Sequence, residues 1–196
     1  YVVRLAKALR KKGYAFKIHM LGDGELKPVI CREVESSGLG QSFVFYGYTQ
    51  PEGVRDVMEK CHIHLFTSND LEGWGAVVNE GMNSGCVEVV NAQVGAAPYL
   101  IRHGVNGLVY PKDQYDKMEA LVLDLFANWD NCKQMGYAAY TTIRDMWNAE
   151  HAAKALLRFA DKLQQGVIEP EQAGPLSIAP VTAPGKMYQA MMDGEI

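Results

Sequence analysis

The sequence predicts an α/β fold of the Rossmann-like, doubly wound kind, with helices on both faces of a parallel sheet. Two observations predict it. Short apolar runs rich in β-branched and aromatic residues alternate with longer segments of helical periodicity. Glycine-bearing polar turns follow most of the apolar runs. The chain has 196 residues, 48% of them hydrophobic, which is enough to bury a core without disulfides. We therefore expect parallel strands joined by right-handed crossovers.

The expected elements follow one another without long gaps. Val2, Leu5 and Leu9 recur at helical spacing, so the chain opens on a helix that ends at Gly13. Pro28 and Pro51 suit the first turns of two further helices, where the missing N–H is tolerated. The predicted strands are 14–21, 43–46, 62–66, 87–91 and 107–110, and the predicted helices between them are 25–37, 51–60 and 75–83.

The C-terminal third divides into two parts of different character. Residues 113–165 have a helical pattern that is interrupted near 128–131 and near 147–148. Residues 166–196 hold four of the eight prolines and a single aromatic residue, Tyr188. We interpret 1–165 as one Rossmann-like domain and 166–196 as an extended C-terminal tail. Ile178 and the segment 187–192 are the parts of the tail that could pack onto another surface.

Charge and cysteine content exclude several classes of protein. The net charge of −4 disfavours nucleic acid as the main partner, because binding to a phosphate backbone needs a basic surface. Residues 1–20 carry six Lys or Arg and no acid, which fits a solvated helix face or contact with a membrane surface. No apolar stretch is long enough for a transmembrane helix. No two of the four cysteines form a CxxC motif, so we expect reduced thiols in a cytoplasmic protein.

The binding site is expected where the parallel strands end, because ligands of doubly wound folds bind outside the carboxyl ends of the strands. That rule indicates the loops 22–25, 47–51 and 67–75. The third loop opens a helix, and Gly73 and Gly75 permit a close approach of the backbone and a positive φ. The first N–H groups of that helix, around residues 76–78, lack internal acceptors and favour an anion such as phosphate.

Two acids flank this helix start. Glu72 lies in the loop, and Glu80 follows eight residues later inside the helix. A carboxylate can accept hydrogen bonds from two neighbouring ribose hydroxyls. The alternative is that Glu72 only complements the helix dipole and that Glu80 is an ordinary surface acid. Trp74 similarly fits either contact with a sugar or nucleotide or packing in the core.

Other chemistry is less well supported. The segment Gly22-Asp23-Gly24 lacks the third glycine of a dinucleotide fingerprint, so we do not expect NAD. His62 and His64 share a strand face, but no further metal ligands accompany them. We expect hydrogen-bonded strand histidines and no metal site.

Taken together, several segments resemble one enzyme family. Glu72 and Glu80 are similar to the E-x7-E motif of the family 4 (group 1) retaining glycosyltransferases, whose fold is GT-B. Further similar segments occur in the family's order: 21–24, 45–48, 86–90, 95–98 and 104–109. The resemblance covers about residues 1–163 and indicates the C-terminal, donor-binding half of such an enzyme.

The resemblance implies roles by position. Glu80 would bind the ribose hydroxyls of a nucleotide sugar, and Glu72 would face the transferred sugar as the catalytic residue. The amides of the helix start would hold the diphosphate. Tyr48 and Thr49 would lie near the base, and Gly22 and Gly24 would line the back of the nucleotide pocket. The helix-start residues in question are Gly73, Trp74, Gly75, Ala76, Val77 and Val78. The family implies transfer with retention of configuration, a nucleoside diphosphate sugar as donor, and no cofactor or metal.

Some features of the family are not found in this sequence. Its Arg and Lys beside the diphosphate, its first strand and its N-terminal acceptor domain would all precede Tyr1, so we expect this chain alone to lack transferase activity. A sheet edge left open there invites self-association or cover by the tail. The enzyme is expected in the cytoplasm, peripheral to the inner membrane face if its acceptor is a lipid. The alternatives are a nucleotide-sugar epimerase of similar shape and a non-catalytic nucleotide-binding module.

Overall fold

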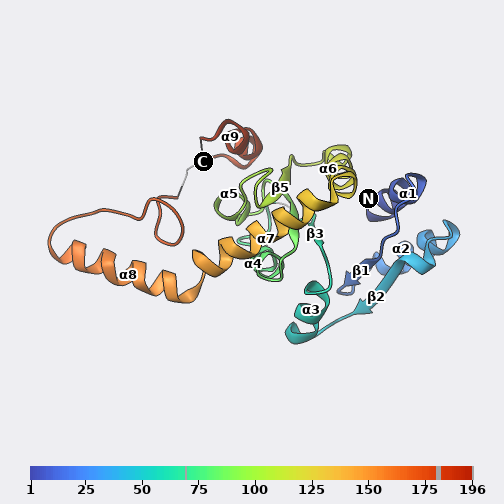
Figure 1. The fold of residues 1–196 in the computed structure, drawn as a ribbon, viewed down its shortest axis with the longest axis horizontal. Helices are drawn as coiled ribbons and strands as arrows, with labels where there is room; N and C mark the ends of the chain where they lie inside the picture. The colour runs from blue at the N-terminus through green and yellow to red at the C-terminus, as the bar shows by residue number, and fades with distance from the viewer. Residues whose placement is uncertain (69, 180–181, 196) are drawn as a thin grey trace.

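A computed structural model describes residues 1–68, 70–179 and 182–195. Its five strands are parallel and form two groups (Figure 1). Strand β1 (Ile18–Leu21) pairs with β2 (Phe43–Gly47), and β3 (Ile63–Phe66), β4 (Val87–Asn91) and β5 (Gly107–Tyr110) pair in that order. Parallel pairing and the α/β class are as the sequence predicts. Among the described residues, however, no ladder joins β1 to β3, so the strands form two sheets rather than one.

The helices lie close to the predicted positions. They are α1 (Val2–Lys11), α2 (Lys27–Ser36), α3 (Pro51–Met58), α4 (Ala76–Asn83), α5 (Ala97–Leu100), α6 (Tyr115–Ala127), α7 (Trp129–Asp145), α8 (Ala149–Gln164) and α9 (Met187–Asp193). Short 3₁₀ turns span Gly40–Ser42 and Pro184–Lys186. The predicted interruptions in the C-terminal helical region separate α6 from α7 and α7 from α8.

The central strand β4 separates two layers of core. Its side chains alternate, so Val87 and Val89 pack with α1 and α6, whereas Val90 packs with α4, α5 and α7. All five residues of β4 are buried, as expected for a parallel strand with helices on both faces. This arrangement leaves α4 directly against the sheet, with its first residue near the carboxyl ends of the strands.

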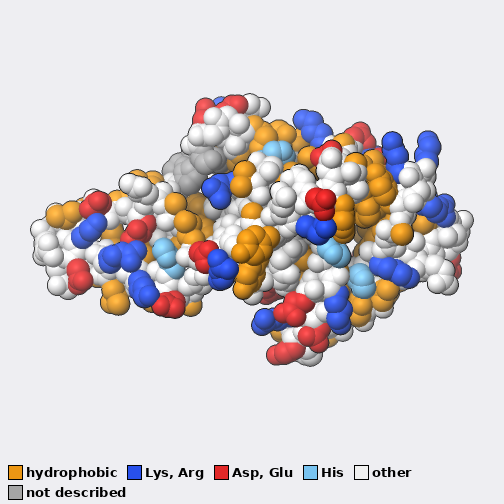
Figure 2. Space-filling view, viewed as in Figure 1, with side chains coloured by type: hydrophobic (Ala, Val, Ile, Leu, Met, Phe, Trp, Pro, Cys, Tyr) orange, Lys and Arg blue, Asp and Glu red, His pale blue; other side chains and the backbone are white. Residues whose placement is uncertain are grey.

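Helix α1 connects the two sheets. Leu5 and Leu9 pack into the core of the three-stranded sheet, and Val3 and Ala6 pack into a second cluster with α2 and β2. Basic side chains gather over α1 (Figure 2). Within the described chain several of them are paired with the protein itself. Arg4 forms ion pairs with Asp116 and Glu119 of α6, and Lys7 lies 3.1 Å from Glu33 of α2. These ion pairs favour the solvated helix face over a membrane-binding one.

The tail contains a helix that the sequence does not predict. Tyr188, Met191 and Met192 of α9 pack against the core cluster of α4, α5, β5 and α7, and Ala190 is buried. Figure 1 shows α9 beside α5 and β5, while α8 projects away from the sheet. The methionines of 187–192 therefore pack onto the domain as anticipated. They do so near β5 and not along β1 or β3, where cover of an open edge was expected.

One asparagine ties the last strand to a helix. Asn106 is fully buried before β5, and its Oδ1 accepts from the Arg102 N–H at 2.7 Å. Its Nδ2 donates to the Leu100 carbonyl and to Thr142 Oγ1 of α7, both at 2.9 Å. The G-x-N-G turn therefore has a structural function in this fold. Among the described residues, no helix is both long enough and apolar enough to span a membrane.

Candidate functional site

Helix α4 begins at a glycine that no other residue can replace without strain. Gly75 is the N-cap and has φ +85°, in the left-handed region. A Cβ there would lie 2.8 Å from Val94 Cγ1 and 3.0 Å from Phe66 Cε1. No side chain of the described residues caps the helix, and the Val78 N–H donates to the Gly75 carbonyl at 2.9 Å. The first amides of α4 therefore face the carboxyl ends of the strands without a protein cap. Gly73 is not among the glycines with positive φ, so that part of the prediction holds for Gly75 only.

The loop before α4 is held by the loop that follows β4. The Ala96 N–H donates to the Trp74 carbonyl at 2.8 Å. A Cβ on Gly95 would lie 1.8 Å from the Gly73 carbonyl oxygen, so the two backbones touch. Residues Gly73, Trp74, Gly95 and Tyr99 take part in lining a cavity of about 350 Å³ at this contact, and Met187 of α9 closes one side of it.

Trp74 packs against other aromatic rings and is also partly exposed. Its indole is 38% exposed, and its Nε1 donates to Asn79 Oδ1 at 2.7 Å, which anchors the loop to the second turn of α4. Its ring also packs in an aromatic cluster, with centroids 5.5 Å from Tyr99 and 5.9 Å from Trp147. The exposed edge of the indole is available to a ligand, and the packed edge gives the loop one conformation.

The two predicted acids lie on either side of the start of α4. Glu72 is half-buried in the loop, and Glu80 is exposed on the helix. Neither carboxylate takes part in an ion pair found within the described residues. Both are therefore free to accept hydrogen bonds from a ligand. Their roles as catalytic and ribose-binding residues remain predictions.

The other predicted residues form a second group at the ends of β1 and β2. The Gly22 N–H donates to the Gly47 carbonyl at 2.9 Å, which joins the loop of Gly22 and Gly24 to the loop of Tyr48 and Thr49. Tyr48 is 80% exposed, as a residue that stacks on a base would be before binding. Near this junction Lys27 lies 3.1 Å from Asp23. The predicted residues therefore form two groups. One follows the carboxyl ends of β1 and β2, and the other follows the carboxyl end of β3.

A buried ionisable pair lies under α4 and was not predicted as a unit. His64 and Glu88 are partners in the β3–β4 register, and His64 Nδ1 lies 2.8 Å from Glu88 Oε2. Glu88 is fully buried, whereas the His64 side chain is 21% exposed. Gly81 of α4 lies over the pair, since a Cβ at that position would be 1.9 Å from Glu88 Oε1. The expectation that strand histidines are hydrogen-bonded is confirmed for His64.

The family follows from the sequence comparison. The profile of the family described as glycosyl transferases group 1 matches residues 1–142. The chain belongs to the group 1 glycosyl transferases. Its fold is that of their C-terminal domain: the C-terminal domain of the group 1 protein LpcC from Francisella tularensis superposes with a TM-score of 0.66. That match has 18% identity and covers 73% of this chain and 75% of that domain.

Two further proteins are similar to this chain, one in sequence and one in structure. The amylovoran biosynthesis glycosyltransferase AmsK of Erwinia amylovora is 22% identical over 166 residues, which are 82% of this chain and 40% of AmsK. The Anabaena protein HepE, solved in complex with UDP and glucose, superposes with a TM-score of 0.61 at 18% identity over 82% of this chain and 44% of HepE. The chain spans two-fifths or less of the length of the curated relatives it matches.

Two cysteines of this glycosyl transferase domain, Cys86 and Cys132, are thiols of low reactivity. All four are free, and Cys86 and Cys132 are buried. Burial raises the pKa of Cys86 to about 12 and that of Cys132 to about 11. A thiol with so high a pKa is not a nucleophile at neutral pH. This agrees with the expectation of reduced, structural cysteines.

The His64–Glu88 pair predicts how the stability of the domain depends on pH. Burial by itself would lower the pKa of His64, but the charge and hydrogen bond of Glu88 outweigh it, with a smaller contribution from Glu80, so the pKa is raised. Burial also raises the pKa of Glu88. The folded pair therefore keeps one proton at a pH where an unfolded histidine, with a pKa near 6.5, has lost it.

The unfolding free energy should consequently decrease as the pH rises above about 6.5, by at most about 1.4 kcal/mol per pH unit, until the pKa of folded His64 is passed. Urea denaturation between pH 6 and 9 measures this decrease. The double variant His64→Leu/Glu88→Val should lose it. Equal pH dependence in both proteins would contradict the assignment.

Proposed function

We propose that this chain is the donor-binding part of a glycosyltransferase that transfers a sugar from a nucleoside diphosphate sugar. The observation that carries the proposal is the uncapped start of α4 at Gly75, which meets the loop after β4 and has Glu72 and Glu80 on either side. Helix N–H groups stabilise the negative charge that develops on a departing diphosphate. Complexes of relatives support the choice of donor, since HepE has been solved with UDP and with UDP-glucose.

The proposed roles are those that position indicates. The amides of residues 74–77 hold the diphosphate, since the Val78 N–H already donates to the Gly75 carbonyl, and Glu80 accepts hydrogen bonds from the ribose hydroxyls. Glu72 faces the transferred sugar, where its carboxylate orients hydroxyls or stabilises positive charge at the anomeric carbon. Tyr48, 80% exposed, stacks on the base. Retention of configuration is proposed on family grounds, and the acceptor belongs to the whole protein.

Replacement of Glu80 tests the proposal directly. Calorimetric titration of the chain with UDP, GDP and ADP should show binding of at least one of them. The Glu80→Ala variant should bind that nucleotide about 10- to 100-fold more weakly, because hydrogen bonds to a charged acceptor contribute about 1.5–3 kcal/mol each. Glu35→Ala is the matched control, since Glu35 is also an exposed acid on a helix, α2.

Two results would count against the proposal. One is the absence of binding for all three nucleotides at millimolar concentration by a folded chain. The other is equal loss of affinity in Glu80→Ala and Glu35→Ala, which would indicate that Glu80 acts only through the net charge of the domain.

A further inference from the structure

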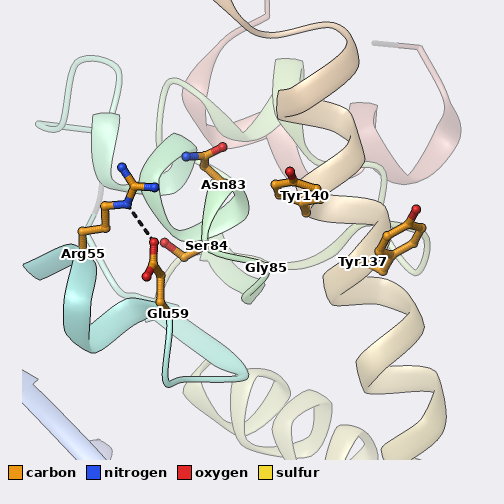
Figure 3. A pocket seen from close by; sticks show the side chains of 7 residues that line it. All are labelled: Arg55, Glu59, Asn83, Ser84, Gly85, Tyr137 and Tyr140. Carbon is orange, nitrogen blue, oxygen red and sulfur yellow. Dashed lines mark hydrogen bonds and ion pairs between the residues drawn. The ribbon is translucent and has the colours of Figure 1, made fainter.

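A second cavity lies at the opposite end of α4 from the proposed donor site. It has a volume of about 470 Å³, within the range of small-ligand sites. Its walls come from three regions, as Figure 3 shows: Arg55 of α3 with Glu59 just after that helix, the last residue of α4 with the turn that follows it at Asn83–Gly85, and Tyr137 and Tyr140 of α7. Asn83 lies about 12 Å along α4 from Gly75 at 1.5 Å per residue and about one helical turn beyond Glu80, and none of the lining residues is one that is assigned to the donor site.

Two tyrosines form an aromatic wall of this cavity. Tyr137 and Tyr140 are three residues apart and therefore share a face of α7. They are 63% and 36% exposed, which is unusual for rings of this size on the surface of a domain. The Arg144 guanidinium lies 5.6 Å from the Tyr140 ring centroid and is itself held by Asp145 at 2.6 Å. Tyr140 is therefore supported from its own helix while its ring remains accessible.

The opposite wall supplies hydrogen-bonding groups of both kinds. Arg55 Nε donates to Glu59 Oε1 at 2.8 Å, which fixes a guanidinium beside a carboxylate (Figure 3). Asn83 is exposed at the last position of α4, and no partner of its amide is found among the described residues. The Ser84 hydroxyl donates to the Glu80 carbonyl at 2.9 Å and keeps its own oxygen lone pairs for a ligand.

Two of the walls are in backbone contact. Gly136 of α7 packs on the backbone at the end of α4, since a Cβ there would lie 2.4 Å from the Gly85 carbonyl oxygen. The tyrosine face and the end of α4 therefore have a fixed separation.

The electrostatics of the cavity select against anions. It lies at the C-terminal end of α4, which carries the negative end of the helix dipole, while the charges of Arg55 and Glu59 offset one another as an ion pair at 2.8 Å. A phosphate or a nucleotide is thus disfavoured here, in contrast to the start of the same helix. A neutral ligand with an apolar face for the tyrosines and hydroxyls for the guanidinium, carboxylate and amide fits both walls. Sugar rings have this chemistry, because their C–H groups stack on aromatic faces and their hydroxyls donate and accept.

We propose that this cavity is a carbohydrate-binding subsite that takes one or two neutral sugar residues of an oligosaccharide. It is separate from the proposed donor site and does not depend on that site's being correct. A chain held here would be retained by the domain between transfer steps without occupying the nucleotide.

Chemical-shift mapping of the ¹⁵N-labelled chain with three probes, maltotetraose, cellotetraose and N,N′,N″-triacetylchitotriose at up to 20 mM, tests the proposal. At least one probe should shift amides at 55–59, 83–85 and 137–140, with the same shifts in the presence of saturating UDP. Tyr140→Ala should weaken this binding by about tenfold or more, whereas Tyr140→Phe, which keeps the ring, should retain most of it.

Asn83→Ala provides a second variant if Tyr140→Ala does not fold, because Asn83 is exposed and its side chain has no described partner. It should also weaken binding. The absence of shifts with all three probes would overturn the proposal, and so would shifts confined to 73–80. If the chain binds an oligosaccharide at 55–59, 83–85 and 137–140 but binds no UDP, the carbohydrate subsite is supported and the proposed donor site is not.

Discussion

Gly81→Ala is expected to destabilise the domain by about 3 kcal/mol, even though alanine is the better helix former by about 1 kcal/mol. The added methyl would lie 1.9 Å from Glu88 Oε1 and 3.0 Å from His64 Nδ1. Glu88 is fully buried on the central strand, so its carboxylate cannot move into solvent without a shift of the surrounding structure. The substitution must therefore either displace α4 from the sheet or separate the carboxylate from its histidine. Urea denaturation at pH 6 measures the loss.

Replacement of the buried pair should reverse most of that loss. His64→Leu/Glu88→Val removes the carboxylate that the new methyl would strike together with its histidine, and replacing a whole buried ionisable pair by apolar residues is often close to neutral. Gly81→Ala should thus cost much less stability in the His64→Leu/Glu88→Val background than in the wild type. Gly40→Ala is the control, because nothing lies within 4 Å of a Cβ at Gly40. An equal cost of Gly81→Ala in both backgrounds would show that Gly81 is not present to make room for the pair.

Most of the fold is predictable because its elements are set by local patterns. The bounds of β4 and β5 agree with the predicted strands 87–91 and 107–110, and both strands are fully buried. The strand predicted at 14–21 is shorter, since β1 pairs only from Ile18, opposite Phe43. Tyr14 and Phe16 are apolar because they pack against core clusters, not because they pair. Alternation of apolar residues indicates which side chains are buried. Whether the backbone also pairs in a sheet depends on a neighbouring strand, which begins only opposite Ile18.

Helix α9 shows the limit of composition as a guide. Its flanking prolines and glycines are typical of an irregular tail, yet Tyr188, Met191 and Met192 pack onto the domain. That contact is tertiary, with residues 45 or more positions earlier in the chain, and no local pattern reports it. The prediction of packing by 187–192 rested only on their being apolar.

The candidate site was predicted as far as chain neighbours could define it. Gly75 and the acids on either side are recognisable because they adjoin one helix start. The pair of His64 and Glu88 is 24 residues apart, and each residue alone is an ordinary polar member of an apolar strand. Two signals could have found it: the shared position of the two residues in neighbouring strands, and a glycine, Gly81, in the interior of a helix where alanine would be favoured. The contact of Gly95 with Gly73 has no sequence signal beyond glycine itself.

Gly95→Ala should abolish most donor binding while costing less stability than Gly81→Ala. The Cβ would lie 1.8 Å from the Gly73 carbonyl oxygen and 3.2 Å from Trp74 Cα, and both neighbours are backbone atoms that no rotamer change can move. The loop of residues 73–74 must shift by the order of 1 Å and lose its hydrogen bond from the Ala96 N–H. Loss of one hydrogen bond from the loop to a charged phosphate would weaken nucleotide binding by about 10- to 100-fold. Because the loop is exposed, the shift disturbs little of the core.

Titration of wild type and Gly95→Ala with UDP and with UDP-glucose measures the effect, and Gly185→Ala, which nothing approaches within 4 Å, is the control. Weaker binding of both ligands would place the 73–74 loop at the diphosphate. Weaker binding of UDP-glucose alone would place it at the sugar. Unchanged affinity for both, in a folded variant, would mean that the two glycine loops meet for structural reasons only, and the proposed donor site would then rest on Glu80 alone.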